Sequence, residues 1–432
     1  MILFFIVVFA LGVPASLLID RDRSWIARVG ESWYLGAGLV WASMMLFWSP
    51  FPLLVIALLL FRRRGTTHRL RLSVFDLTTL ITIGGYALFA TAAAPWEFDY
   101  LTDFGWKART FFERGGIDWT FLRTHVDALP SFNPSYPVLL SSLYDAVALL
   151  SGEWNDRFLG LVHVAFGVAA ICVVRAELAE ESRFAALGTA IIAPLLLSPW
   201  IGMGDGPVGS LMFAAVLRLR RETSYAGAIF LGLAACVKQE GIAFVVAVAI
   251  AMLVTRPSSG LRPPSPRERG EGTPETPLPA ARGEGGRRPG EGRLLLIAAL
   301  IAVPWMIAAR LHGVTGRTFH AHIADPRPLL GAIAHVSIGK PLMWSGILLG
   351  AILCWRALDR FLLVAVAAQF VFYVCAYLAS SYDAEWHVAH SWERILSQIT
   401  PILVFVIVSS LAKTLARLYY SSSTSEQWPL HP

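Results

Sequence analysis

The chain has 432 residues, of which 56% are hydrophobic and only 15% are charged. In a typical soluble domain about a quarter of the residues are charged, so the composition excludes an ordinary soluble enzyme. It predicts an all-α, polytopic membrane protein. In such a protein the net charge of +6 reflects the placement of basic residues in the loops, and we expect no binding of nucleic acid.

Uncharged apolar runs long enough to cross a bilayer recur along the chain. They predict a bundle of about twelve transmembrane helices, near residues 1–19, 33–61, 73–95, 157–176, 184–200, 207–219, 224–237, 240–255, 293–310, 341–356, 360–379 and 395–414. The run 33–61 contains Pro50 and Pro52, which predict one kinked helix or two short ones. The shorter run 136–150 fits a helix at the membrane surface.

Basic residues indicate how the bundle is oriented. If Arg62–Arg64 face the cytoplasm, most of the lysines and arginines fall on that side, as the positive-inside rule requires. Most of the histidines then lie on the outer side, together with Asp99, Asp205 and Lys238. Ionisable groups in or beside a membrane are costly and usually serve a site. We therefore expect an active site on the outer, periplasmic face of the cytoplasmic (inner) membrane.

Composition also divides the chain into modules. Residues 1–255 form an N-terminal transmembrane module whose outer loop, 96–137, contains surface helices and is the expected catalytic loop. Residues 256–293 are rich in Pro, Gly, Arg and Glu and predict a disordered cytoplasmic insertion. Residues 294–419 form a C-terminal transmembrane module, and 420–432 a loose tail. The four cysteines lie within apolar runs without metal-ligand spacing, as packing residues do.

The outer loop carries the first group of candidate residues. Asp99, Asp103 and Lys107 recur every four residues, so on a helix they share one face. Two carboxylates and an ammonium beside Trp96 make a plausible surface for a sugar and a phosphate. An ordinary ion pair on a solvated helix explains the same spacing equally well.

Three further segments carry polar groups next to apolar runs. Asp205 lies in a glycine-rich turn, where it suits either a site or a helix N-cap. Lys238 and Glu240 separate two short apolar runs, as a functional pair or a structural ion pair. His387, His390 and Arg394 share a helical face at the start of the last span. The planar guanidinium of Arg394 is suited to an anionic phosphate.

Metal and nucleotide chemistry receive little support. His320 and His322 are weak candidates for metal ligands, because no other residues have metal-site spacing and solvated loop histidines explain the pair better. No Walker sequence, GxGxxG, HExxH or GxSxG motif occurs in a convincing context. ATP-driven transport and serine hydrolysis lose support accordingly.

Five short motifs in order resemble the C-type glycosyltransferase superfamily across about residues 73–415. They are Phe98-Asp99 with Lys107-Ala108, Asn133-Pro-Ser-Tyr-Pro137, Gly204-Asp-Gly-Pro207, Lys238-Gln-Glu-Gly241, and Trp386-His387 with Ser391, Arg394, Gln398 and Pro401. The chain looks most similar to the transferases that use polyprenyl-phosphate sugars, which include protein mannosyltransferases and lipid A aminoarabinose transferases. It departs from that pattern at Phe104, where relatives often carry Trp.

The resemblance implies an enzyme that takes a sugar from a polyprenyl-phosphate donor in the membrane lipid. The sugar passes, with inversion, to an acceptor in a glycan, lipid or protein. Asp99, or as second choice Asp103, would be the general base. The resemblance assigns the remaining site residues to substrate and lipid-phosphate binding: Lys107, Tyr136, Asp205, Lys238, Glu240, His387 and Arg394. No metal or other cofactor is required, because the leaving group is already a stable phosphate.

Two other functions fit the same residues. A transporter or flippase of lipid-linked sugars would use the charges to line a path and would carry polar residues at mid-span or inverted repeats, neither of which is evident in the sequence. A catalytically inactive membrane subunit would keep the fold without the chemistry, and it would tolerate Asp99→Asn.

Overall fold

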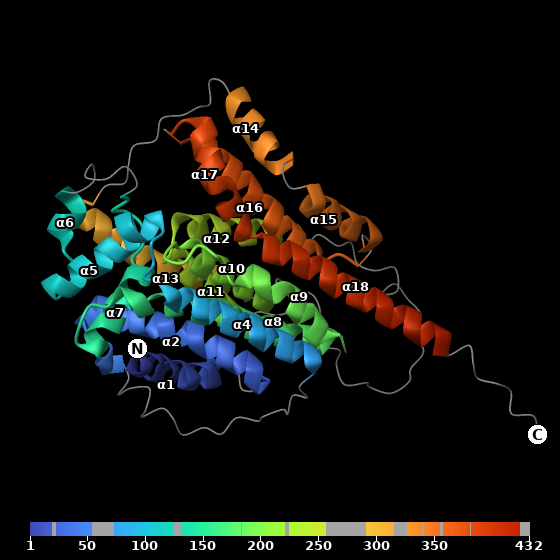
Figure 1. The fold of residues 1–432 in the computed structure, drawn as a ribbon, viewed down its shortest axis with the longest axis horizontal. Helices are drawn as coiled ribbons and strands as arrows, with labels where there is room; N and C mark the ends of the chain where they lie inside the picture. Colours follow the sequence, from blue (N-terminus) through green and yellow to red (C-terminus); the bar gives the residue numbers. More distant parts are fainter. Residues whose placement is uncertain are drawn as a thin grey trace, which may run out of the picture.

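The computed structural model describes residues 1–19, 23–53, 73–124, 132–182, 184–220, 224–255, 291–314, 326–338, 341–354, 357–380 and 382–423. All regular secondary structure in these ranges is helical, without a β-strand, as the sequence predicts (Figure 1). His320, His322, the basic run Arg62–Arg64 and nearly all of the expected insertion lie outside them. A helix already begins at Glu291, inside the expected insertion, and the last described helix ends at Ser423, inside the expected tail. Both segments are therefore shorter than predicted.

Most N-terminal helices form one packed bundle. Its members are α1 (Ile2–Ile19), α2 (Trp25–Phe47), α4 (Val74–Ala92), α8 (Gly160–Glu181), α9 (Ala185–Leu196), α10 (Asp205–Leu219), α11 (Tyr225–Ala235) and α12 (Gln239–Thr255). Helices α1 and α2 approach closely at Gly12, which has no side chain. A Cβ at this position would lie 1.8 Å from the Ser32 carbonyl oxygen. Helix α10 is buried along nearly its whole length and is the centre of the bundle.

Shorter elements of the loop after α4 cover one end of this bundle. They are η1 (Tyr100–Phe104), α5 (Gly105–Arg114), α6 (Trp119–Thr124), α7 (Leu139–Ser151) and the 3₁₀ turn η2 (Asp156–Phe158). Helix α7 packs against α2 and α5, and its residues from Leu139 to Ala148 are buried. The run expected at the membrane surface is thus covered by protein, because its apolar side chains find partners on both neighbours.

The C-terminal helices join this bundle along α11 and α12. They are α13 (Glu291–Leu311), α14 (Arg327–Ile338), α15 (Pro341–Cys354), α16 (Arg360–Leu378), α17 (Ala384–Ser397) and α18 (Thr400–Ser423). Helix α13 packs on α11 and α16 packs on α12. Helices α14 and α17 pack together, at the top of Figure 1. Side chains far apart in the sequence therefore meet where α12, α16 and α17 converge.

Among the described residues, six helical segments are long and apolar enough to cross a membrane, which indicates a membrane protein. They are Ile2–Ile19, Val74–Ala92, Asp156–Glu181, Gly292–Leu311, Arg360–Leu378 and Glu385–Leu415. Each run predicted as a span lies largely on a helix, but several helices are shorter than a span. In the run 33–61, α2 ends at Phe47, ahead of both prolines, because Trp48 adopts a left-handed conformation with φ of 50°.

A buried ionic lattice ties the bundle together near the C-terminal end of α10. The guanidinium of Arg218 lies 2.5 Å from Glu31 on α2 and 3.0 Å from Glu177 on α8. Arg220 binds both Glu177 and Glu181. Removing one partner of such a buried set leaves an uncompensated charge, at a cost of about 3–5 kcal/mol. This lattice fixes the packing of α2, α8 and α10, and with it the far end of α10, where Asp205 lies.

Candidate active site

The glycine-rich turn before α10 positions the first acidic group. Gly202 has φ of 101°, and a Cβ there would lie 2.7 Å from the Tyr100 Cβ, so the turn requires glycine at this position. Gly204 is the N-cap residue of α10. Asp205 is therefore the first residue of the helix and does not cap it, and its carboxylate is directed towards side chains of other elements.

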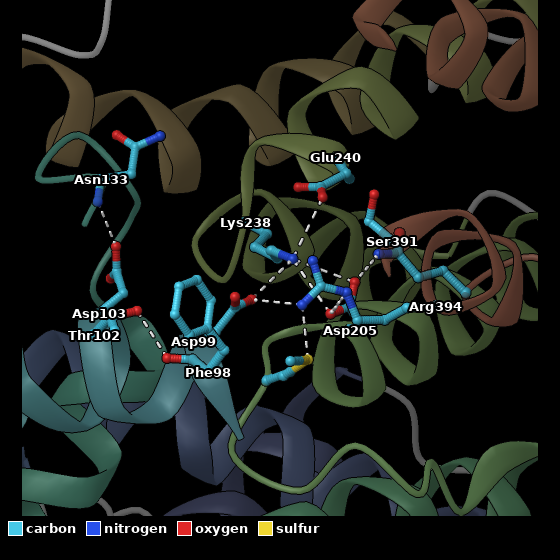
Figure 2. A network of polar contacts seen from close by, with 12 residues as sticks. Phe98, Asp99, Thr102, Asp103, Asn133, Asp205, Lys238, Glu240, Ser391 and Arg394 are labelled. Atoms are coloured by element: carbon cyan, nitrogen blue, oxygen red, sulfur yellow. Dashed lines mark hydrogen bonds and ion pairs between the residues drawn. The ribbon is translucent and has the colours of Figure 1, made fainter. Parts of the chain in front are cut away.

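Asp205 is the buried anchor of an ion cluster (Figure 2). Its oxygens lie 3.2 and 3.3 Å from Lys238 Nζ, and its Oδ2 lies 3.3 Å from Arg394 Nε. The amide of Gln398 donates a 2.5 Å hydrogen bond to Oδ1. The side chain of Asp205 has no exposed surface. Two cations and one amide thus hold this carboxylate in a fixed position.

Asp99 and Glu240 complete the cluster from two other segments. Asp99 Oδ2 lies 3.2 Å from Arg394 Nη1 and 3.6 Å from Lys238 Nζ. Glu240 Oε1 lies 3.5 Å from Lys238 Nζ. The other Glu240 oxygen, Oε2, has no hydrogen-bond partner within the part of the chain that the structure describes. Three carboxylates therefore surround two cations, contributed by the loop after α4, α10, the start of α12 and α17.

Asp103 and Lys107 form a second, separate ion pair. Lys107 Nζ lies 2.7 Å from Asp103 Oδ1 and donates to the Asn133 carbonyl at 2.7 Å. Asp103 Oδ2 accepts a 2.8 Å hydrogen bond from the backbone N–H of Asn133. Both side chains are buried. The pair therefore clamps the loop around Asn133 to α5, and both Asp103 oxygens are engaged in that contact.

The predicted shared face holds for Asp103 and Lys107, which pair at i,i+4, but Asp99 does not share it. The π turn η1 begins directly after Asp99, with the N–H of Gly105 bonded to the Tyr100 carbonyl. This wider turn breaks the α-helical register between the two aspartates. Figure 2 shows Asp99 directed towards Lys238 and Arg394, and Asp103 directed towards Asn133. The structure thus separates the two candidates for the general base.

Burial governs the protonation of the Asp103–Lys107 pair, which we call the clamp. It raises the pKa of Asp103 to about 6, although Lys107 opposes the shift. It lowers the pKa of Lys107, although Asp103 opposes that shift. At the rim of the ion cluster, burial also raises the pKa of Glu97, against the charge of Arg394.

Tyr136 connects the clamp with the ion cluster. Its ring centroid lies 5.8 Å from Lys107 Nζ and 5.9 Å from Lys238 Nζ, within range of a cation–π contact. The ring stacks on Phe104 at 6.2 Å between centroids. Phe104 is thus an aromatic platform for Tyr136. A shift of the clamp would move Tyr136 relative to Lys238.

His387 packs against aromatic rings. Its ring packs 4.4 Å from Tyr377 and 5.2 Å from Tyr382, between centroids. Ser391, one turn along α17, shares a 2.6 Å hydrogen bond with the Tyr377 hydroxyl. The predicted face of α17 therefore divides into an aromatic part that contains His387 and an ionic part that contains Arg394.

An apolar cavity of about 1370 Å³ lies between α12, α13 and α16. Its wall contains Val246 of α12, Met306 of α13 and Phe372 of α16. The polar side chains of its lining are Ser135, Gln239 and Arg310. Ser135 is the chain neighbour of Tyr136, and Gln239 lies between Lys238 and Glu240. The cavity therefore reaches residues that are chain neighbours of the ion cluster.

Sequence reasoning did not identify Tyr373, which supports Asp205 through Gln398. Gln398 belongs to a quoted motif, whereas Tyr373 lies within an apolar run. The Tyr373 hydroxyl donates a 2.7 Å hydrogen bond to Gln398 Oε1. Met203, whose sulfur contacts Arg394 Nη1, was also missed. A tyrosine and a glutamine within predicted spans were the available signal, because such groups rarely face lipid.

No group of three or more potential metal ligands occurs within the described ranges, which do not include His320 and His322. Comparison of the chain with protein-family models, curated proteins and solved structures found no match. The chemistry of the site is therefore inferred from its geometry. The cluster offers a carboxylate that can accept a proton beside two cations that can bind an anion.

Proposed function

We propose that this chain is a membrane glycosyltransferase that moves a sugar from a polyprenyl-phosphate donor to an acceptor hydroxyl or amine. The observation that carries the proposal is the ion cluster, in which Asp99, Lys238 and Arg394 meet from three distant segments. A glycosyl transfer from a phosphate needs both a proton acceptor and cations for the leaving group. The cluster places a proton acceptor, Asp99, within 3.6 Å of two cations, Lys238 and Arg394.

The proposed reaction assigns one role to each side of the cluster. The acceptor oxygen or nitrogen attacks the anomeric carbon and forms the new glycosidic bond, while the bond from that carbon to the phosphate oxygen breaks. Asp99 takes the acceptor's proton, and the phosphate leaves with the electron pair, stabilised by Lys238 and Arg394. Asp205, itself held by Gln398, keeps these two cations in place. Attack opposite the leaving phosphate inverts the anomeric centre.

The apolar cavity supports a lipid-linked donor. A polyprenyl chain needs a long apolar surface next to a polar headgroup site, and the cavity between α12, α13 and α16 reaches Gln239, the chain neighbour of Lys238. The isoprenoid chain would lie against side chains such as Val246 and Phe372. A soluble nucleotide sugar would have no use for such a surface.

Charge placement favours this proposal over transport. Helix α10 carries Asp205 at its start and Arg218 near its end, about 20 Å away along the axis. No ionisable residue lies between them in the sequence. At its far end Arg218 is held in the buried ionic lattice with Glu31 and Glu177. A polar route along this central helix is therefore missing, whereas a catalytic site at one end needs none.

The test is transfer by the purified full-length chain. Polyprenyl-phosphate sugars are incubated with the protein, and release of free polyprenyl phosphate is measured with and without candidate acceptors. The proposal expects turnover that depends on the protein and a product of inverted anomeric configuration. Movement of intact donor across vesicles without release of phosphate would instead support a flippase. Binding without turnover under all acceptors would support an inactive subunit.

A further inference from the structure

The two cations of the ion cluster already have carboxylate partners. Lys238 contacts Asp99, Asp205 and Glu240, and Arg394 contacts Asp99 and Asp205. A phosphate entering this cluster brings a further negative charge into a place where carboxylates outnumber cations. At least one carboxylate must then give up its contacts, because anions at a shared cation repel each other.

Asp205 is the carboxylate least able to move. It is fully buried and receives Lys238, Arg394 and Gln398 at once. Gln398 is itself held by Tyr373. Displacing Asp205 would leave a buried charge and a buried amide without partners, at a cost that a phosphate contact does not offset. Asp205 is therefore the permanent counter-ion of the two cations.

Asp99 is held differently. A single oxygen, Oδ2, accepts both cations, and the distance to Lys238 is 3.6 Å, the longest in the cluster. Its side chain is 13% exposed, and it stands at the boundary of the π turn η1. Among the residues of the cluster, it alone bridges both cations without being fully buried. Glu240 is 14% exposed but contacts Lys238 alone.

Arg394 has a contact that a better acceptor would replace. Its Nη1, the same atom that binds Asp99, also lies against the sulfur of Met203. A thioether is a weak hydrogen-bond acceptor, whereas a phosphate oxygen is a strong one for a guanidinium. Once Asp99 withdraws, this nitrogen is directed at the space that Asp99 has left, between Arg394 and Lys238.

We propose that the Asp99 carboxylate holds the phosphate position between Lys238 and Arg394, and that the donor's phosphate displaces it. This inference rests on the proposed glycosyl transfer and adds the order of events. The phosphate takes the two cations, and the released Asp99 becomes available to the acceptor's proton. Donor binding thus activates the base, and Asp99 competes with the donor while its carboxylate remains bound to the cations.

The test is the affinity of the purified full-length chain for undecaprenyl phosphate, with undecaprenol as the probe that lacks the phosphate. Asp99→Asn removes the competing charge, so it should bind undecaprenyl phosphate about tenfold more tightly than the wild type. Its affinity for undecaprenol should not change. Asp99→Ser is measured in parallel, so that a poorly folding asparagine variant does not decide the outcome.

Glu240→Gln is the matched control. It removes the same charge from a side chain of nearly equal exposure that touches Lys238 but not Arg394. The affinity of Glu240→Gln for undecaprenyl phosphate should rise clearly less than that of Asp99→Asn, because Glu240 contacts only one of the two cations. Equal tightening in Glu240→Gln and Asp99→Asn would overturn the inference in favour of net charge alone. Unchanged or weaker phosphate binding in both Asp99 variants, or tighter undecaprenol binding, would also overturn it.

These results are separable from the proposed function. Tighter phosphate binding by Asp99→Asn supports the exchange even if no sugar transfer is found. Sugar transfer by the wild type without tighter binding in the variant leaves the transferase proposal intact and removes the exchange.

Discussion

Asp99 Oδ2 and Arg394 Nη1 lie 3.2 Å apart, although 295 positions separate the two residues in the chain. Asp99 belongs to the loop after α4, and Arg394 belongs to helix α17. Their contact also includes Lys238, from the junction of α11 and α12. The candidate site therefore exists only when the N-terminal and C-terminal helices are packed together, and mutations at this junction test the function directly.

Arg394→Lys should weaken donor use although the charge is retained. Lysine cannot bind Asp205 through Nε and Asp99 through Nη1 at the same time, as Arg394 does. We expect kcat/KM for the polyprenyl-phosphate donor to fall by about tenfold or more. Equal steady-state kinetics in Arg394→Lys and the wild type would show that the fork geometry is not used.

Tyr373→Phe tests the support behind Asp205. The variant removes one hydroxyl, so that Gln398 Oε1 loses its donor while the ring remains in the core. A positioning role predicts that kcat falls about tenfold with little change in KM, and that stability falls by about 1 kcal/mol. Thermal unfolding and steady-state kinetics are measured on the same preparation. Lost stability with unchanged kcat would reduce Tyr373 to a packing residue.

The clamp should make stability depend on pH. Because the folded-state pKa of Asp103 is raised from 3.8 to about 6, the folded chain binds this proton more tightly than the unfolded chain. Its contribution to stability is therefore fully present below about pH 4 and is lost as the pH rises through about 6. Asp103→Asn removes that dependence. The difference in melting temperature between wild type and variant should change between pH 4 and pH 7; a constant difference contradicts the raised pKa.

Filling the apolar cavity should discriminate against long lipid chains. Val246→Trp places a large ring on the lining, at a position that is 57% exposed. It should raise KM for a long polyprenyl-phosphate donor by about tenfold and leave a short isoprenoid donor nearly unaffected. Leu253→Trp is the control, because Leu253 is on the same helix, is 77% exposed and does not line the cavity. Equal effects of both variants would exclude the cavity as a lipid site.

The sequence predicted the helices and most members of the ion cluster, because apolar runs and polar groups beside them are local signals. Asp99, Asp205, Lys238, Glu240 and Arg394 were all named in advance, and they do meet. Their pairing could not be predicted, since it depends on how α10, α12 and α17 pack.

The remaining differences have local causes. The π turn after Asp99 has no clear sequence signature, so the four-residue spacing suggested one shared face with Asp103. Asp205 was compatible with an N-cap until Gly204 was found in that position. Helix α7 has the length of a surface helix, and only its neighbours α2 and α5 reveal that it is buried. About twelve spans and a periplasmic site stay predictions.

The most direct test of the proposed base is the single-turnover rate of sugar transfer from a saturating polyprenyl-phosphate donor, with Asp99→Asn and Asp103→Asn compared against the wild type. The account predicts that Asp99→Asn binds donor but transfers at least about 100-fold more slowly, whereas correctly folded Asp103→Asn keeps most of its rate. Full transfer by Asp99→Asn, or a loss confined to Asp103→Asn, would contradict it.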